Sequence, residues 1–164
     1  MSIEAVTGTG AKVKWVNDVF CHGKKVCGIL TEGSFDMESG GLEYAVLGIG
    51  VNIKKPGRGY PAEISGVAGA VYENGEPEPE TRSRMIAEIL KRFWDYYRNL
   101  PGKAFLTEYK ARSFIIGQDV DVIFGETSRR AQALDIDDGC RLVVQFEDGS
   151  TEALSSGEVS IRPR

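Results

Sequence analysis

Residues 25–32 read Lys-Val-Cys-Gly-Ile-Leu-Thr-Glu, a largely apolar run with one glycine inside it. A run of this length and composition, bounded by turn residues, indicates a β-strand. The residues before it, Cys21-His22-Gly23-Lys24, are typical of the tip of a β-hairpin. On the other side of that tip, Lys12–Asp18 begins by alternating polar and apolar residues and then meets Asn17-Asp18. This pattern predicts a strand that ends in a turn.

A third strand is predicted at Leu42–Ile53, after the natural hairpin loop Ser39-Gly40-Gly41. Three antiparallel strands therefore follow one another along the chain. Prolines and glycines are dense between Lys54 and Thr81 and make poor helix or strand interiors. We expect a long surface loop there, with one short element around Ile64–Val71.

Two helices are predicted after this loop. Between Arg82 and Leu100, apolar residues recur with the three-and-four spacing of an amphipathic helix. Pro101-Gly102 ends this helix, and a shorter helix is expected at Lys103–Arg112. The apolar faces of both helices are expected to cover the sheet.

The remainder of the chain changes to short alternating segments separated by Asp-Gly turns, which predicts a β-meander that closes into a small barrel. The expected fold class is therefore α+β, an antiparallel-rich sheet with two helices packed on it, followed by a small β-barrel. The domain boundary is placed near Ser113, giving domains 1–113 and 114–164. The barrel segments are Val120–Phe124, Ala131–Ile136, Leu142–Phe146, Ser150–Leu154 and Val159–Ile161.

Composition excludes several classes of protein. The chain of 164 residues has 20 basic and 24 acidic residues, a formal net charge of −4, and no local basic stripe for a nucleic acid. No apolar run approaches the roughly 18 residues of a membrane-spanning helix. The three cysteines have no paired spacing, which favours free thiols in a reducing cytoplasm.

Common catalytic and cofactor motifs are absent. Gly23-Lys24 lacks the earlier glycine and the following Ser or Thr of a P-loop, and Gly48-Ile-Gly50 lacks the third glycine of a dinucleotide fold. Cys21, His22 and Cys27 lack a fourth ligand for structural zinc, so no metal site is predicted. Because His22 is the only histidine, a Ser-His-Asp or Cys-His apparatus is disfavoured.

Lysines, asparagines and glycines remain as candidate functional residues on adjacent predicted strands. A strand glycine is informative because it allows a backbone or a ligand to approach closely. Lys25 would be costly to bury in a sheet without an anion, whereas beside a phosphate or carboxylate it neutralises charge. The alternative, a hairpin-end lysine in water, stays open from spacing alone. The candidates are Lys14, Asn17, Lys25, Gly28, Gly48, Gly50 and Asn52.

Three blocks of this sequence resemble, in order and spacing, the signatures of the biotin protein ligase (biotin-[acetyl-CoA-carboxylase] ligase) family. The likeness continues through Arg112–Gly117 into a segment that looks like the family's SH3-like domain and ends at Glu158–Arg162. Val16 stands where many members have proline, a change that removes no functional group. The blocks are Lys14-Trp-Val-Asn-Asp-Val19, Gly23-Lys-Lys-Val-Cys-Gly-Ile-Leu-Thr-Glu32 and Gly48-Ile-Gly-Val-Asn-Ile53.

The resemblance implies an enzyme that uses ATP, with Mg²⁺, to activate biotin to biotinyl-5′-AMP. The biotin then passes to a lysine of the biotin carboxyl carrier domain of a carboxylase. In this family pattern Lys25 is the catalytic residue, lying between the carboxylate of biotin and the α-phosphate. Gly28 and the backbone of Ile29 would let biotin lie against the strand.

The same resemblance assigns the other binding residues. Asn52 would hydrogen-bond the adenine, and Asn17 with Lys14 would help to fix the phosphate and magnesium region. Gly48 and Gly50 are also expected among the residues that bind biotin or the adenylate.

The family's catalytic domain starts well before the Lys14–Val19 block, with the strands of the biotin cage and a Gly-Arg-rich loop that closes over the adenylate. Nothing in this sequence corresponds to them, or to the DNA-binding winged helix of some members, and Met1–Thr9 is expected to be the end of a helix. An alternative function is therefore a non-catalytic dimerisation or carrier-binding module, inactive without that half. We also expect a homodimer through sheet edges, at Lys12–Trp15 or Leu42–Val46.

Overall fold

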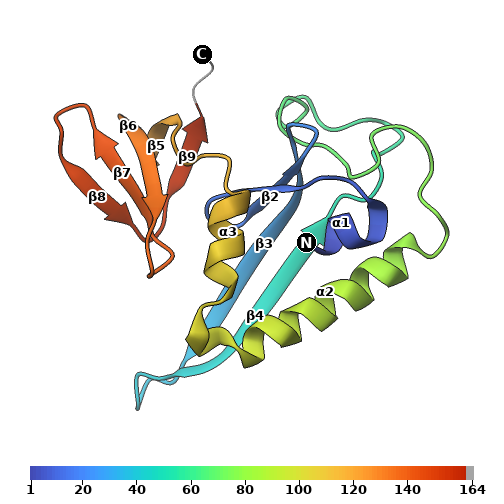
Figure 1. Ribbon diagram of the computed structural model, residues 1–164, viewed down its shortest axis with the longest axis horizontal. Coiled ribbons are helices and arrows are strands. Elements are labelled where there is room, and N and C mark those ends of the chain that lie inside the picture. The colour runs from blue at the N-terminus through green and yellow to red at the C-terminus, as the bar shows by residue number, and fades with distance from the viewer. Residues whose placement is uncertain (162–164) are drawn as a thin grey trace. The chain divides into compact units, whose positions relative to one another are not determined.

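The computed structural model describes residues 1–161, which form two compact units. One unit consists of Met1–Ala11 and Asn17–Glu88, and the other consists of Lys12–Val16 and the chain from Ile89 onward. Helices and antiparallel sheets confirm the α+β class, while the boundary near Ser113 stays a prediction. The elements, shown in Figure 1, are α1 (Ser2–Thr7), β1 (Lys12–Lys14), β2 (Asp18–Cys21), β3 (Lys24–Phe35), β4 (Leu42–Val51), α2 (Thr81–Arg98), the 3-10 turn η1 (Leu100–Gly102), α3 (Phe105–Arg112), β5 (Asp119–Phe124), β6 (Thr127–Ile136), β7 (Leu142–Phe146), β8 (Thr151–Leu154) and β9 (Glu158–Ile161).

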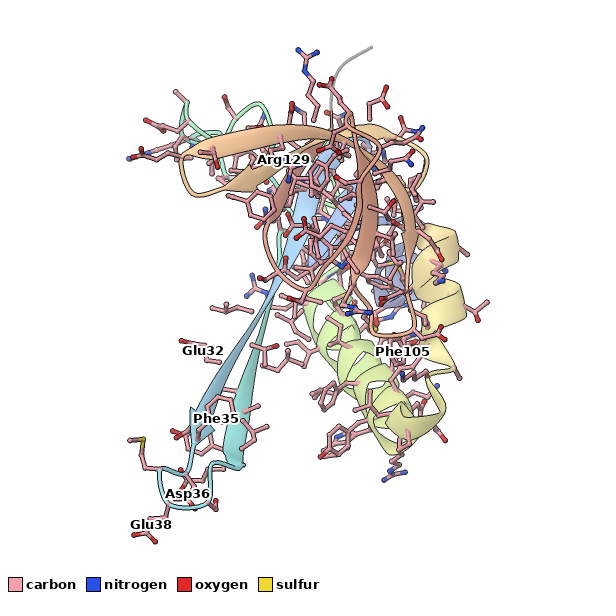
Figure 2. The ribbon with its side chains drawn as sticks, turned by 90° about the vertical axis from the view of Figure 1, so that its left-hand side faces the viewer. Glu32, Phe35, Asp36, Glu38, Phe105 and Arg129 are labelled. Carbon is pink, nitrogen blue, oxygen red and sulfur yellow. The ribbon has the colours of Figure 1, made fainter. Side chains whose placement is uncertain are left out.

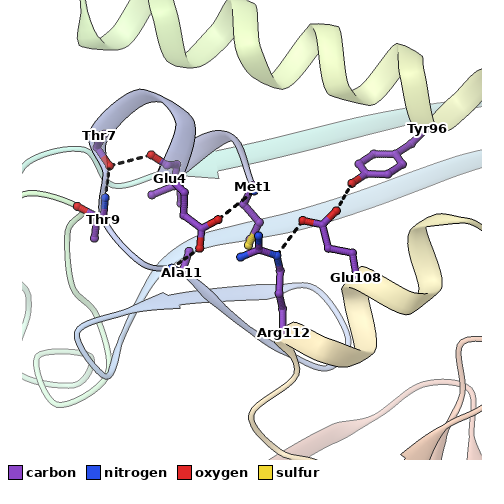
Figure 3. Close-up of polar contacts among 9 residues, drawn as sticks. Met1, Glu4, Thr7, Thr9, Ala11, Tyr96, Glu108 and Arg112 are labelled. Atoms are coloured by element: carbon purple, nitrogen blue, oxygen red, sulfur yellow. Dashed lines mark hydrogen bonds and ion pairs between the residues drawn. The ribbon is translucent and has the colours of Figure 1, made fainter.

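The first unit begins with the helix expected at the N-terminus. Helix α1 ends at Gly8, whose left-handed φ of 71° and N–H bond to Glu4 O are typical of a helix C-cap. The Glu4 side chain then accepts a hydrogen bond from the Ala11 N–H at 3.1 Å, as Figure 3 shows. This bond fixes the direction in which the chain leaves the helix.

Strands β2 and β3 form a hairpin at the predicted tip, with His22-Gly23 as its two-residue loop. The strand predicted at Lys12–Asp18 is instead divided into β1 and β2 by a turn at residues 15–17. Both loop residues have positive φ, 51° for His22 and 74° for Gly23. Paired positive φ values characterise the type I′ turn, whose twist matches that of two antiparallel strands. Glycine in the second position makes this turn accessible at low cost.

Strands β3 and β4 form a long antiparallel hairpin, with pairing from Cys27↔Val51 to Phe35↔Leu42. Strand β3 is longer than predicted because it continues past Glu32 to Phe35. The loop closes through the Asp36 carboxylate, which accepts the Ser39 hydroxyl at 2.6 Å. Figure 2 shows Phe35 and Asp36 at the far end of this hairpin, and strand order β2-β3-β4 leaves β4 at one edge of the sheet.

Residues 54–80 contain no helix or extended strand, and the short element expected around Ile64–Val71 is only a turn followed by an isolated bridge at Ala68. The segment is also not a surface loop throughout. It returns to β3, where Ala68 forms a parallel bridge with Lys25, and Lys54 pairs in the same way with Tyr72. Ala70 is only 2% exposed as a result. The glycine and proline content therefore predicted the lack of regular structure but not the burial.

Helices α2 and α3 confirm the two predicted helices, and η1 lies where Pro101-Gly102 was expected to end the first one. In the second unit, Glu108 of α3 accepts hydrogen bonds from Tyr96 Oη at 2.6 Å and from Arg112 Nε at 2.8 Å (Figure 3). These bonds lower the pKa of Glu108, so the carboxylate stays ionised and ties the two helices together.

The second unit has a five-stranded antiparallel sheet in the order β8-β7-β6-β5-β9, and the five predicted segments are confirmed. Trp15, Leu106 and Ile115 lie in the same buried cluster as the strand residues. Trp15 Nε1 donates to Cys140 O at 2.9 Å, and the Phe114 N–H donates to Val13 O. The segment before Asn17 thus packs with the C-terminal sheet. The predicted Arg162 end of this domain lies outside the described residues.

No helix within residues 1–161 is both long and apolar enough to cross a membrane. All three cysteines are free, with Cys21 and Cys27 buried and Cys140 half-buried.

Candidate functional site

A β-bulge brings Lys25 and Gly28 to the same face of the sheet. The β2–β3 register runs from Asp18↔Gly28 to Val19↔Cys27 and then jumps to Phe20↔Lys25. The extra residue in β3 resets the alternation of side-chain direction. The Lys25 side chain therefore lies over Gly28, where an added Cβ would be 3.4 Å from Lys25 Cε and 3.6 Å from Lys25 Nζ.

Two more glycines extend this surface. Gly50 lies opposite Gly28 in the β3–β4 ladder, and Gly48 lies opposite Leu30. Paired residues, and residues two apart on a strand, share one face of an antiparallel sheet. Gly28, Gly48 and Gly50 thus lie on one face, beside the exposed side chain of Leu30, and this group of three glycines is named here the glycine face.

Protein packing does not require glycine in β4 at the glycine face. A Cβ on Gly48 would be 3.7 Å from Leu30 O, and one on Gly50 would be 3.9 Å from Gly28 O, both ordinary contact distances. A strand glycine nevertheless costs about 0.5–1 kcal/mol relative to alanine. An explanation that fits both facts is a ligand that lies directly against the backbone.

Lys25 is held at the edge of the glycine face by an ion pair and by the backbone. Its Nζ lies 2.6 Å from Asp18 Oδ1, with the Lys25 side chain 40% exposed and that of Asp18 18% exposed. The Lys25 N–H donates to Val67 O at 2.8 Å, and its carbonyl accepts the Gly69 N–H at 2.9 Å. The alternative of a lysine free in water therefore does not describe this residue, whose ammonium is held by Asp18 beside Gly28.

Asn17 binds the polar backbone groups of Ile29. Asn17 Nδ2 donates to Ile29 O at 2.5 Å, and the Ile29 N–H donates to Asn17 O at 3.0 Å. With its N–H already bonded, the backbone of Ile29 offers a ligand no hydrogen-bond donor. Asn17 keeps its amide oxygen as an acceptor.

Asn52 is fixed at the end of β4. Its N–H donates to Val26 O at 2.7 Å, and its Nδ2 donates to Gly69 O at 3.0 Å. Tyr60 Oη donates to the same Gly69 O at 2.7 Å, and partial burial raises the pKa of Tyr60, so the phenol stays protonated at neutral pH. The amide oxygen of Asn52 can then accept from an N–H donor such as an exocyclic amine.

Seven of the eight predicted site residues lie in the first unit. Lys14 lies half-buried on β1 and belongs to the second unit. The seven residues in the first unit are Asn17, Lys25, Gly28, Ile29, Gly48, Gly50 and Asn52.

Sequence reasoning missed Asp18, Tyr60 and Gly69. Asp18 stands beside Asn17, but the pair was interpreted as turn residues, although Asp18 begins β2 and faces Lys25. Tyr60 and Gly69 lie in a segment without periodicity, so no pattern indicated their bonds to the site. A tyrosine among loop glycines and prolines was the one available signal.

The buried thiols show no sign of activation. Burial raises the pKa of both Cys21 and Cys27 to about 11, so both are protonated at neutral pH and are poor nucleophiles and metal ligands. His22 is exposed on the hairpin turn. Within residues 1–161, no group of three or more His, Cys, Asp or Glu side chains is placed to hold a metal ion.

Comparison with known families identifies the C-terminal sheet of the second unit. Residues 115–162 match the family model described as the biotin protein ligase C terminal domain. The five-stranded sheet with its preceding segment is therefore a domain of that class.

The likeness extends over almost the whole chain. It is 31% identical over 159 residues to the biotin-[acetyl-CoA-carboxylase] ligase of Mycobacterium tuberculosis, covering 94% of this chain and 54% of that protein. It is 27% identical to the bifunctional ligase/repressor BirA of Bacillus spizizenii, covering 94% of this chain and 47% of that protein. The chain thus spans about half the length of the curated relatives it matches.

Solved structures agree with these relatives. The apo structure of the Aquifex aeolicus biotin protein ligase superposes with a TM-score of 0.77 at 26% identity, covering 99% of this chain and 70% of that one. The same enzyme in complex with biotin and ATP gives a TM-score of 0.76 and covers 66% of that chain. Residues 115–162 thus match the C terminal domain of biotin protein ligases, the chain as a whole is similar to biotin protein ligases, and the predicted antiparallel sheet followed by an SH3-like barrel is confirmed.

Proposed function

We propose that this chain carries part of the site of a biotin protein ligase, which uses ATP to activate biotin to biotinyl-5′-AMP and transfers the biotin to a lysine of a biotin carboxyl carrier protein. The observation that carries the proposal is the Lys25 ammonium, fixed over Gly28 at the edge of the glycine face. The relative from Aquifex aeolicus was crystallised with biotin and ATP, the two substrates proposed here.

In the first step, a carboxylate oxygen of biotin attacks the α-phosphorus of ATP, and pyrophosphate leaves with its magnesium. Lys25 would stabilise the negative charge on the oxygens of the α-phosphate as the new bond forms. Its compact ammonium suits this role, and the fixed strand supplies the positioning. ATP enters as its Mg²⁺ complex, which is substrate rather than a resident cofactor.

In the second step, the ε-amine of the carrier lysine attacks the acyl carbon of biotinyl-AMP, and AMP leaves. The adenylate would lie along the glycine face, with the Asn52 amide oxygen accepting from the adenine amine. By the family pattern, Asn17 and Lys14 would act on the phosphate and magnesium region. The free cysteines fit a reducing cytoplasm as the place of this reaction.

The second candidate function is a non-catalytic dimerisation or carrier-binding module. It is favoured by β4, an edge strand that exposes apolar side chains such as Leu42, Tyr44 and Val46, each more than half exposed. An edge of this kind pairs readily with another strand, including that of a second copy. The proposed homodimer would form there.

The test that separates the two candidates is titration calorimetry of this chain with biotin, with MgATP and with each in the presence of the other. A ligase site should bind both, and the binding of one should strengthen that of the other. Lys25→Ala should weaken MgATP binding, whereas Lys110→Ala, which also removes a lysine paired to an aspartate, should not. A chain that binds neither ligand, while forming dimers in sedimentation, would support the module instead.

A further inference from the structure

The ion pair between Lys25 and Asp18 lies beside Gly28, at the edge of the glycine face. Asp18 lies directly opposite Gly28 in the β2–β3 ladder, so the backbone fixes the position of its Cα and the face to which its side chain points. Lys25 enters from the other side of the bulge, and its Nζ meets Asp18 Oδ1 at 2.6 Å. The two side chains meet beside Gly28, where an added Cβ would also be 3.9 Å from Asp18 Oδ1.

A lysine side chain has many rotamers, and fixing it in one of them needs a specific partner. The backbone bonds of Lys25 to Val67 and Gly69 fix its Cα but leave its four-carbon arm free to turn. Gly28, over which that arm lies, has no side chain to pack against it. Asp18 is therefore the group that determines where the ammonium lies.

We propose that Asp18 is a positioning residue, which holds the Lys25 ammonium over Gly28 so that it meets an anionic group arriving on the glycine face. This inference rests on the proposed function of the site and adds a residue to it. Asp18 acts through Lys25 and does not itself touch the substrate. A carboxylate is suited to this role because its charge selects the ammonium and its two oxygens let the ammonium turn toward a second anion without leaving.

The first experiment measures the position of the ammonium without any reaction. In ¹⁵N-labelled full chain, the order parameter of the Lys25 ammonium is compared between wild type and Asp18→Asn. Asp18→Asn should lower the ordering of Lys25 and leave that of Lys110 unchanged. The matched control is Asp135→Asn, which breaks the Lys110–Asp135 pair of 2.9 Å and should affect only Lys110.

The second experiment is a double-mutant cycle on biotinyl-AMP formation. Asp18→Asn should lower kcat by about tenfold while the KM for ATP changes less than about twofold, because misplacing a catalytic group acts mainly on the transition state. In a Lys25→Ala background, Asp18→Asn should have no further effect on the rate. Asp18→Glu, which keeps the charge on a longer arm, should give an intermediate rate and serves as the test if Asp18→Asn does not fold.

The outcomes separate this inference from the proposed function. If wild type forms no biotinyl-AMP, the proposed function fails, and the ordering of Lys25 still decides whether Asp18 positions it. If Lys25 stays equally ordered in Asp18→Asn, the positioning role is wrong even in an active enzyme. An additive loss in the Lys25→Ala background, or a parallel loss of kcat and melting temperature, would show that Asp18 is structural.

Discussion

Replacing Lys25 by alanine tests the site most directly. The substitution removes one positive charge from the edge of the glycine face and leaves the backbone bonds to Val67 and Gly69 in place. If Lys25 stabilises charge that builds on the α-phosphate, the loss should fall on the rate of adenylate formation rather than on folding.

The expected magnitude follows from the exposure of the side chain. An ammonium about 4 Å from a phosphoryl oxygen interacts by about 4 kcal/mol at an effective dielectric constant of 20 and by about 1 kcal/mol in bulk water. Lys25 is 40% exposed, so its contribution falls between these limits. About 3 kcal/mol corresponds to a loss of roughly 10²-fold, and the range for one electrostatic stabiliser reaches about 10³-fold.

The effect on stability should be small. The Lys25–Asp18 pair is partly exposed, and such pairs contribute about 1 kcal/mol at most. For a chain of this size, 1 kcal/mol shifts the melting temperature by about 2–4 °C. The rate and the melting temperature should therefore respond very differently to the substitution.

The assay is single-turnover formation of biotinyl-AMP from radiolabelled ATP, with a melting curve for each variant. Lys110→Ala is the control, because Lys110 also pairs with an aspartate and lies outside the glycine face. Lys24 is a poor control, since its ammonium donates to Gly66 O and ties down the segment before Gly69. Equal rate losses for Lys25→Ala and Lys110→Ala, or a collapse of the melting temperature in Lys25→Ala alone, would refute the electrostatic role.

Three further predictions concern packing, the ligand surface and the thiols. Ile115→Ala, in the buried core of the second unit, should cost about 2–5 kcal/mol in denaturant unfolding, and a cost below about 1 kcal/mol would contradict the packing described. Gly50→Val should weaken biotin and MgATP binding by more than about tenfold in calorimetry, and Gly57→Val, in an open loop, should not; equal losses would exclude a ligand on the glycine face. Iodoacetamide at neutral pH should label Cys140 before the buried Cys21 and Cys27, and early labelling of Cys27 in mass spectra would show that it is accessible. The free energy of unfolding should fall between pH 9 and about 11, because Cys21 and Cys27 ionise at lower pH in the unfolded chain than in the folded one.

Elements built from local signals could be predicted from the sequence. The His22-Gly23 turn, the apolar periodicity of α2 and the Asp-Gly turns of the C-terminal strands each depend on residues close in sequence. The burial of Ala70 could not be predicted in this way, because it arises from a parallel bridge between Ala68 and Lys25. Such pairing depends on the return path of a long loop, and no local pattern encodes it.

In the candidate site too, local patterns indicated some residues, whereas the contacts between distant residues could not be predicted. Lys25 and the glycines attracted attention because charged residues and glycines are unusual inside strands. The side to which Lys25 points depends on the bulge between Val19 and Phe20, and strict alternation would have placed Lys25 and Gly28 on opposite faces. The family pattern supplied the roles, but the geometry that brings Asp18 to Lys25 had to come from the structure.

The bulge also explains why the site combines a fixed cation with an open surface. In a regular strand, a lysine three positions before a glycine would point to the other face, and the glycine face would lack the positive charge of Lys25. With one extra residue in β3, Lys25 reaches over Gly28 while the backbone on both sides stays in the ladder. A single irregularity, flanked by regular pairing, therefore places a positive charge where a flat anionic ligand can lie, and the rigidity of the surrounding sheet keeps it there.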